Sequence, residues 1–158
     1  MKRFASITAL TAVALAVALS VGAWGKGQGN GQTKGRGHTV TVIEHATTDA
    51  TTDTGAAGDS AGDVLTFAND VFDAADANKV GTDNGYCIRT VAGTAYECNL
   101  TVLLPRGQIT VEGPFHDAKD STLAITGGTG RYRHVRGTMD LQSREGGTKY
   151  AFVFHPNS

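Results

Sequence analysis

The sequence predicts an all-β protein whose main domain is an eight-stranded antiparallel β-barrel. From residue 38 onward, apolar side chains alternate with a period of two, turn-forming residues separate the apolar runs, and no segment has the 3.6-residue period of a helix. Eight short strands without a helix are typical of a sandwich or a closed barrel. Closure removes exposed strand edges, and eight strands enclose room for side chains or for one small ligand.

The first 23 residues have the three regions of a secretory signal peptide. Lys2 and Arg3 come first, an apolar run follows over residues 7–21, and small residues end at Ala23. The apolar run is shorter than the roughly 20 residues that a transmembrane helix needs. We therefore expect cleavage after Ala23, no stable membrane span in the mature protein, and a secreted location.

A glycine-rich segment follows the expected cleavage site. Residues 24–37 read WGKGQGNGQTKGRG, with glycine at many alternate positions and no apolar side chain after the tryptophan. Such a composition is typical of a flexible tether. The barrel domain is then expected to span residues 38–158.

The charge balance argues against a nucleic-acid partner. Without Lys2 and Arg3, the 14 basic residues become 12 against 15 acidic ones, a formal charge of −3. The sequence contains no P-loop, no GxGxxG spacing and no G-x-S-x-G elbow, and its histidines are scattered without metal-ligand spacing. No cofactor and no metal are expected.

Eight segments carry the strand pattern. They are residues 38–46, 64–72, 79–91, 96–104, 108–113, 121–126, 137–143 and 148–155. Between the first two lies TTDATTDTGAAGDSAGD, residues 47–63, which contains only Thr, Asp, Ala, Gly and Ser. This segment is expected to be a mobile loop that buries nothing.

Cys87 and Cys98 flank a predicted hairpin. A turn centred between Ala92 and Gly93 makes Val91 face Thr94, Arg89 face Tyr96, and Cys87 face Cys98. Directly opposed residues on neighbouring strands are close enough for a disulfide, and an exported protein meets an oxidising environment. The sequence therefore favours a Cys87–Cys98 bridge, with two buried thiols as the alternative.

The inward faces of the first two strands each contain one polar residue. Residues i and i+2 share a face, so Glu44 points the same way as Val42, and Asn69 the same way as Phe67. A lone carboxylate in an apolar interior needs a partner or a raised pKa. Arg89 shares the inward parity of its hairpin, which leaves two interpretations: a buried Glu44–Arg89 ion pair, or the polar floor of a ligand site.

Several stretches resemble a known barrel superfamily. GQITVEGPF with DSTLAITGGTG, and GDVLTFANDVF, resemble plant allene oxide cyclases, whereas GGTGRYRHVRG is similar to the G-G-T-G-x-F-R-x-A-R-G segment of dirigent proteins. The matches cover most of residues 38–155. The resemblance implies an eight-stranded antiparallel barrel, commonly a homotrimer, whose cavity holds a hydrophobic small molecule without a cofactor.

The resemblance also implies roles for individual residues. Glu44 and Asn69 match the positions of the catalytic glutamate and asparagine of the cyclases, and Cys87 falls where they have a pocket cysteine. With these, Phe67, Tyr96 and Arg89 are the expected substrate-binding residues.

This sequence departs from both branches of the superfamily. Ala46 replaces a second cyclase asparagine, and the Ser-Pro that completes the cyclase water site has no counterpart, so allene oxide cyclisation itself is not expected. Arg133 and Arg136 match the paired arginines of dirigent proteins; the alternative for them, and for Arg131, is a solvated barrel corner.

The sequence thus leads to two hypotheses. The first is a secreted barrel that binds a hydrophobic small molecule and guides a cofactor-free cyclisation or stereoselective coupling; if the chain is an enzyme, it is an isomerase or cyclase, with Glu44 and Asn69 catalytic. The second is a non-catalytic ligand carrier or envelope-associated structural barrel. A cavity lined by Glu44 and Asn69 would favour the first.

Overall fold

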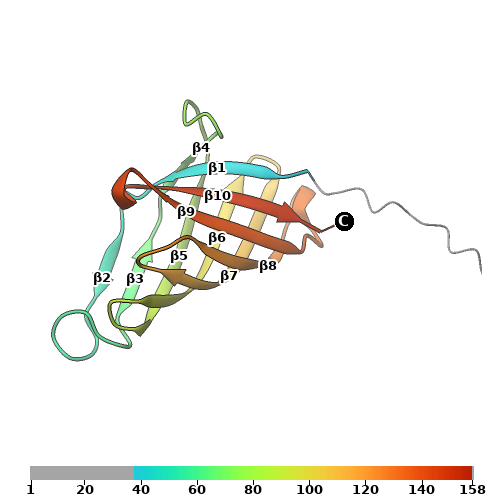
Figure 1. The fold of residues 1–158 in the computed structure, drawn as a ribbon. Coiled ribbons are helices and arrows are strands. Elements are labelled where there is room, and N and C mark those ends of the chain that lie inside the picture. The colour runs from blue at the N-terminus through green and yellow to red at the C-terminus, as the bar shows by residue number, and fades with distance from the viewer. Residues whose placement is uncertain (1–37, 158) are drawn as a thin grey trace, which may run out of the picture. The chain divides into compact units, whose positions relative to one another are not determined.

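Antiparallel strands close into a barrel in the computed structural model, which describes residues 38–157 (Figure 1). The strands are β1 (Val40–His45), β2 (Ala50–Thr52), β3 (Val64–Phe67), β4 (Asp70–Phe72), β5 (Lys79–Val91), β6 (Ala95–Leu104), β7 (Gly107–His116), β8 (Ser121–Gly128), β9 (Gly137–Arg144) and β10 (Lys149–Pro156). Their order is β2-β3-β5-β4-β1-β10-β9-β8-β7-β6, and pairing of β5 with β6 closes the ring. The prediction of an eight-stranded antiparallel barrel is confirmed, while the expected signal peptide and tether lie outside the described residues.

The strand predicted over residues 64–72 is divided into β3 and β4. Both pieces pair with β5. At the break, Asn69 and Asp83 exchange backbone hydrogen bonds of 3.0 and 2.9 Å, while the Thr48 hydroxyl accepts a hydrogen bond from the Ala68 amide. The two pieces therefore occupy one position in the barrel. Because β2 pairs only with β3, outside the closed ring, the ten strands form an eight-stranded barrel.

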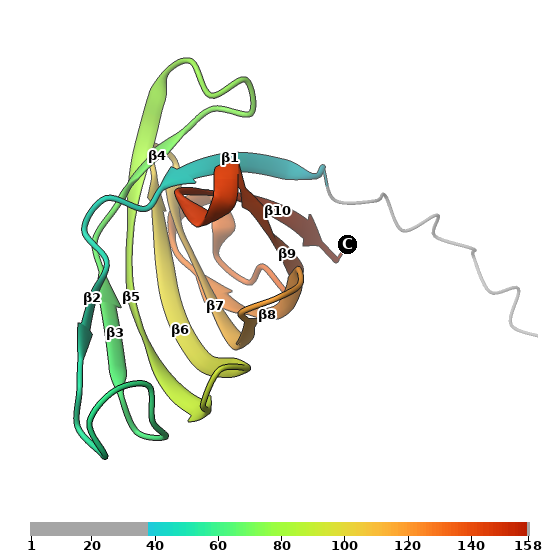
Figure 2. The same ribbon diagram turned by 60° about the vertical axis from the view of Figure 1, so that its left-hand side comes forward.

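The expectation for residues 47–63 was wrong in two respects. Ala50–Thr52 forms the short strand β2, which pairs with β3 beside the long strand β5 (Figure 2). Asp63 is buried and accepts hydrogen bonds from the amides of Thr54 and Ser60. The unsatisfied edge of β3 thus orders a segment whose own composition predicts no strand.

The β5–β6 hairpin has the predicted register at Cys87 and Arg89 but not at its tip. Cys87 faces Cys98, Arg89 faces Tyr96, and the disulfide is present. Val91, however, faces Ala95 because a bulge lies between Arg89 and Val91. The bulge inserts one residue into the β5 side, so the predicted pairing of Val91 with Thr94 was wrong.

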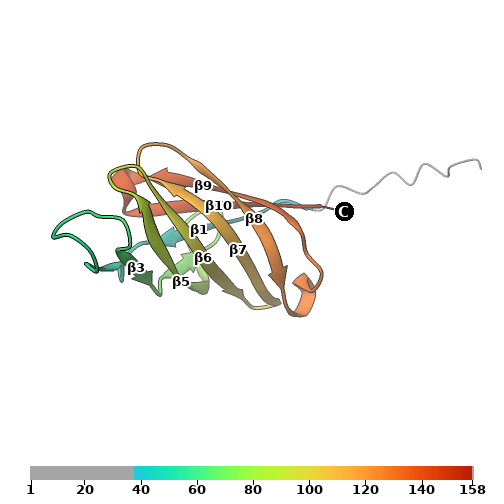
Figure 3. The same cartoon turned by 90° about the horizontal axis from the view of Figure 1, so that it is seen from below.

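One part of the barrel interior is filled by its own side chains. Burial alternates along β6 to β9, which lie side by side in the view from below (Figure 3). The fully or nearly fully buried apolar side chains include Leu100, Val102, Ile109, Val111, Leu123, Ile125, Met139, Phe152 and Phe154. Burial at roughly 25 cal/mol per Å² of apolar surface makes this core the main source of stability.

Two glycines permit tight corners next to the core. Gly107 has a φ of +137° and Gly137 a φ of +140°, and a Cβ atom at either site would lie 2.1 Å from a backbone carbonyl oxygen. Arg131, Arg133 and Arg136 are exposed at the corner before β9, as expected for a solvated turn. Within residues 38–157, no helix has the length and apolar character needed to cross a membrane.

Candidate functional site

An apolar pocket opens into the barrel beside the filled core. Its wall is formed by residues of β1, β3, β5, β6, β7, β9 and β10. Its volume is about 70 Å³. The lining residues are Glu44, Asp49, Leu65, Phe67, Cys87, Cys98, Leu100, Phe115, Leu141, Tyr150 and Phe152. An apolar wall with a few polar groups is the usual construction of a small-molecule site.

Four polar side chains lie near this pocket on or between neighbouring strands of the barrel, namely Glu44, Tyr150, Asn69 and Asp83. Tyr150 on β10 directly faces Glu44 on β1. Asn69 lies between β3 and β4, and β4 pairs with β1. Asn69 faces Asp83 on β5. The closed topology therefore brings together residues that are far apart in the sequence.

Asn69 is fully buried and all of its amide hydrogen-bonding groups have partners. Its Nδ2 donates to Glu44 Oε1 over 2.7 Å and to Asp49 Oδ1 over 2.8 Å. Its Oδ1 accepts hydrogen bonds from the Thr47 amide and from the amide and hydroxyl of Thr48. Asn69 thus holds the carboxyl groups of Glu44 and Asp49 by hydrogen bonds. Asn69 itself does not line the pocket.

Glu44 and Asp83 form a buried carboxyl pair. Glu44 is 5% exposed and Asp83 is 1% exposed, and the part of Glu44 that is reachable faces the pocket. Burial, with the nearby Asp83 charge, raises the pKa of Glu44 to about 9, and burial also raises the pKa of Asp83. Asp83 Oδ2 has no hydrogen-bond partner among the described residues. At neutral pH the pair holds a proton next to an apolar pocket.

Tyr150 adds a second hydroxyl donor at the same wall. Burial, together with the charges of Asp49 and Glu44, raises the pKa of Tyr150, which keeps its phenol protonated. The Tyr150 ring also packs edge-on against Phe115 at 5.7 Å between centroids. The site therefore offers two protonated oxygen donors on adjacent strands.

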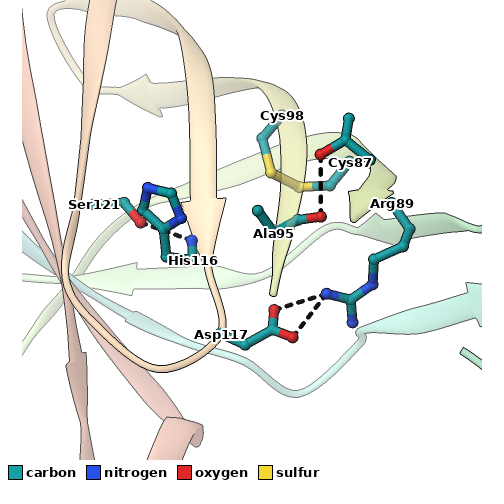
Figure 4. Close-up of a disulfide and its surroundings, with 8 residues drawn as sticks. Cys87, Arg89, Ala95, Cys98, His116, Asp117 and Ser121 are labelled. Atoms are coloured by element: carbon teal, nitrogen blue, oxygen red, sulfur yellow. Dashed lines mark hydrogen bonds and ion pairs between the residues drawn. A yellow bond between two sulfur atoms is a disulfide. The ribbon is translucent and has the colours of Figure 1, made fainter. Parts of the chain in front are cut away.

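The Glu44–Arg89 ion pair considered from the sequence does not form. Arg89 Nη1 donates to both oxygens of Asp117 over 2.8 Å, and its Nε lies 2.7 Å from Asp59 Oδ1. Its guanidinium stacks 3.6 Å from the centre of the Tyr96 ring. Two loops thus supply the acidic partners of Arg89, and Figure 4 shows Asp117 facing it next to the disulfide.

The predicted substrate-binding residues fall into two groups. Phe67 and Cys87 line the pocket, Cys87 as half of the disulfide. Arg89 and Tyr96 do not line it; Tyr96 packs against Phe115, which does. The roles assigned to these residues, and the catalytic roles of Glu44 and Asn69, stay predictions.

Sequence reasoning missed Asp83, Asp49 and Tyr150. Asp83 shares the inward parity of Cys87 and Arg89, so extending that parity along β5 identifies it. Tyr150 shares the parity of the buried Phe152. Asp49 lies in the segment expected to be a loop, where no periodic signal exists.

A second hollow adjoins the pocket at Phe115, Leu141 and Tyr150. It has a volume of about 420 Å³ and is otherwise lined by the connection after β7 and by residues near the β9–β10 turn. A ligand larger than the inner pocket can extend into it. Among residues 38–157 no group of three or more His, Cys, Asp or Glu side chains has a metal-holding arrangement.

The fold and the site define a class: small antiparallel barrels with an apolar pocket and a buried acidic group. Residues 27–154 match the allene oxide cyclase barrel-like domain, and the chain belongs to that family.

Solved structures with the same fold include proteins of several activities. A pyocyanin demethylase is 28% identical with a TM-score of 0.65, over 74% of this chain and 100% of the demethylase. An exo-specific intermolecular Diels-Alderase is 13% identical with a TM-score of 0.63, over 77% and 98%. A pterocarpan synthase dirigent protein is 16% identical with a TM-score of 0.57, over 78% and 99%. The same fold is thus found in proteins described as a demethylase, a Diels-Alderase and a dirigent protein.

Proposed function

We propose that this protein binds a hydrophobic small molecule in the pocket and guides a cofactor-free cyclisation or stereoselective coupling. The observation that carries the proposal is the carboxyl pair of Glu44 and Asp83, which retains a proton at the wall of an apolar pocket. Perturbed carboxyl groups in pockets are characteristic of acid–base sites. A barrel filled only for stability has no need of them.

The apolar wall and the acid have separate tasks in the proposed reaction. Phe67, Phe115 and Phe152 hold the substrate in one folded conformer, which supplies proximity and orientation. Glu44 donates its proton to a substrate oxygen as negative charge develops there and recovers a proton when the product forms. General acid–base assistance of this kind contributes about 10²- to 10⁴-fold.

Asn69 and Asp83 are positioning residues in this scheme. When Glu44 loses its proton, the Asn69 amide stabilises the new carboxylate through the 2.7 Å hydrogen bond. Asp83 keeps the proton on Glu44 at neutral pH. In a cyclisation the proton returns to Glu44 and no atom changes its oxidation state overall, so this reaction needs no oxidant, reductant or cofactor.

A second candidate function is demethylation of pyocyanin or a related small molecule. The likeness to the pyocyanin demethylase supports it, since the match extends over the whole of that protein at 28% identity. The two candidates differ in their products. A cyclisation conserves substrate mass, a coupling joins two molecules, and a demethylation splits the substrate into a demethylated product and a one-carbon product.

The experiment begins with the protein secreted by its own host. Native mass spectrometry of the oxidised protein reports any retained ligand, and host extracts are then incubated with the wild type and with Glu44→Gln. We expect substrate conversion by the wild type and a loss of at least a hundredfold in the variant. Full turnover by Glu44→Gln would refute the role of Glu44, and ligand retention without conversion would favour the carrier. Purified pyocyanin, assayed in parallel, tests the demethylation.

We also propose that the protein is exported, cleaved after Ala23, and assembled as a homotrimer without a nucleic-acid partner. The N-terminal pattern supports the first two points, and the family resemblance supports the third. The same native spectra report the mass of the mature chain and the number of subunits. A retained N-terminus or a monomer would contradict the corresponding part.

A further inference from the structure

We propose that the pocket selects an organic cation, such as an N-alkylated aromatic ring, over neutral and anionic molecules of the same shape. The inference rests on the ligand pocket of the proposed function and adds the charge class of its ligand. It follows from two independent features of the wall, namely its aromatic rings and its uncompensated carboxyl groups.

Aromatic rings form much of the wall. Phe67 on β3, Phe115 on β7, and Tyr150 and Phe152 on β10 line the same pocket. The faces of aromatic rings attract cations, and cages of several rings are the common means of recognising quaternary nitrogen. A flat cation can contact such rings without losing hydrogen bonds, because its charge is spread and weakly hydrated.

The polar groups of the wall are acidic. Glu44 and Asp49 line the pocket, and Asp83 lies behind Glu44. With one proton shared by Glu44 and Asp83, the group retains negative charge, which a cation would neutralise. A carboxylate ligand would instead add a further negative charge in a poorly solvated space.

Two basic side chains near the inner pocket, Arg89 and Lys149, are already paired, whereas His116 and Lys119 line only the adjoining hollow. Among the described residues that line the pocket, none is Lys, Arg or His. Arg89 contacts Asp59 and Asp117, and Lys149 binds Asp76 and Glu145. No residue that lines the inner pocket can therefore balance the charge of a ligand carboxylate held there.

Three probes with one ring skeleton test the inference. They are 1-methylquinolinium, 1-methylnaphthalene and 1-naphthoate, which carry a positive, a neutral and a negative charge. Their dissociation constants are measured by fluorescence titration of the full, oxidised protein at pH 8 and low salt. We expect the cation to bind at least tenfold more tightly than 1-methylnaphthalene and 1-naphthoate to bind most weakly.

Two variants separate the pocket from the overall charge of the protein. Asp49→Asn keeps an acceptor for the Asn69 amide and should reduce cation affinity several-fold while leaving 1-methylnaphthalene binding unchanged. Glu112→Gln makes the same charge change on the exposed side of β7 and should alter neither affinity. Equal loss in both variants would overturn the inference.

The probes also distinguish this inference from the proposed function. If 1-methylnaphthalene binds as tightly as the cation, the charge selection is refuted and the hydrophobic pocket stands. If the anion binds most tightly, the inference is likewise refuted. If no probe binds, both the charge selection and the proposed ligand pocket are contradicted.

Discussion

Replacing Glu44 by Gln should stabilise the barrel, and the gain should grow with pH. Burial raises the pKa of Glu44 from 4.5 to about 9, so the folded state binds a proton that the unfolded state releases above pH 4.5. Stability from this group is complete below pH 4.5 and is lost as pH rises toward 9. Gln cannot ionise, and its amide can still accept from Asn69 and donate to Asp83.

The magnitude follows from the distance in pH between the unfolded pKa and the working pH. At pH 7 the wild type must take up a proton at Glu44 on folding, which costs about 3 kcal/mol at roughly 1.4 kcal/mol per pH unit. Because Asp83 competes for the same proton, this figure is an upper value. We expect Glu44→Gln to raise the free energy of unfolding by about 2–3 kcal/mol at pH 7 and by less than about 0.5 kcal/mol at pH 4.5.

Urea unfolding of the oxidised protein, followed by far-ultraviolet circular dichroism between pH 4.5 and 8.5, measures this difference. Glu112→Gln is the matched control and should follow the wild type at every pH. Asp73→Asn should change the free energy of unfolding in the opposite direction. Hydrogen bonds from the Ala77 amide and from Asn78 lower the pKa of Asp73. Removing this carboxylate should therefore destabilise the barrel above pH 4. A Glu44→Gln variant that is less stable than the wild type at pH 7 would refute the reasoning.

Three further substitutions test other parts of the structure by the same unfolding assay. Replacing both Cys87 and Cys98 by Ser should lower the unfolding free energy by about 3 kcal/mol, since the bridge restrains the unfolded chain; an unchanged midpoint would contradict this. Arg89→Met leaves two half-exposed aspartates without their partner and should cost about 2 kcal/mol, with a smaller loss at 1 M salt. Gly137→Ala places a Cβ atom 2.1 Å from the His155 carbonyl oxygen and should cost at least about 2 kcal/mol, whereas full stability would show that the corner can shift.

The fold was predictable because each strand of a closed barrel has one face toward the interior and one toward solvent. This arrangement produces the alternation of apolar and polar residues in the sequence. Strand parity placed Glu44 and Asn69 inside, and the hairpin register paired Cys87 with Cys98. The segment Ala50–Thr52 was not predictable, because its strand conformation depends on the free edge of β3. The residues of this segment alone do not indicate that a free strand edge lies beside them.

The site was predictable only where an apolar pattern surrounds the polar residue. Asp83 lies between Gly81 and Gly85 on its face of β5, so no apolar neighbours reveal that the face is buried. Asp49 takes its place from a hydrogen bond to Asn69, which is 20 residues away in sequence. Partners of this kind become visible only when the chain has closed.

The stability and the activity of Glu44→Gln together decide why the buried carboxyl is present. A group expected to lower stability by about 2–3 kcal/mol at neutral pH persists when its loss impairs function, because stabilising changes are otherwise easy to find. The proposed acid role therefore requires Glu44→Gln to be more stable and less active than the wild type. Asn69→Leu supplies the converse: it removes the donors that hold Glu44 and Asp49, and should lower both quantities. If Glu44→Gln were more stable and fully active, the acid would have no role in turnover, and the barrel would be better described as a carrier.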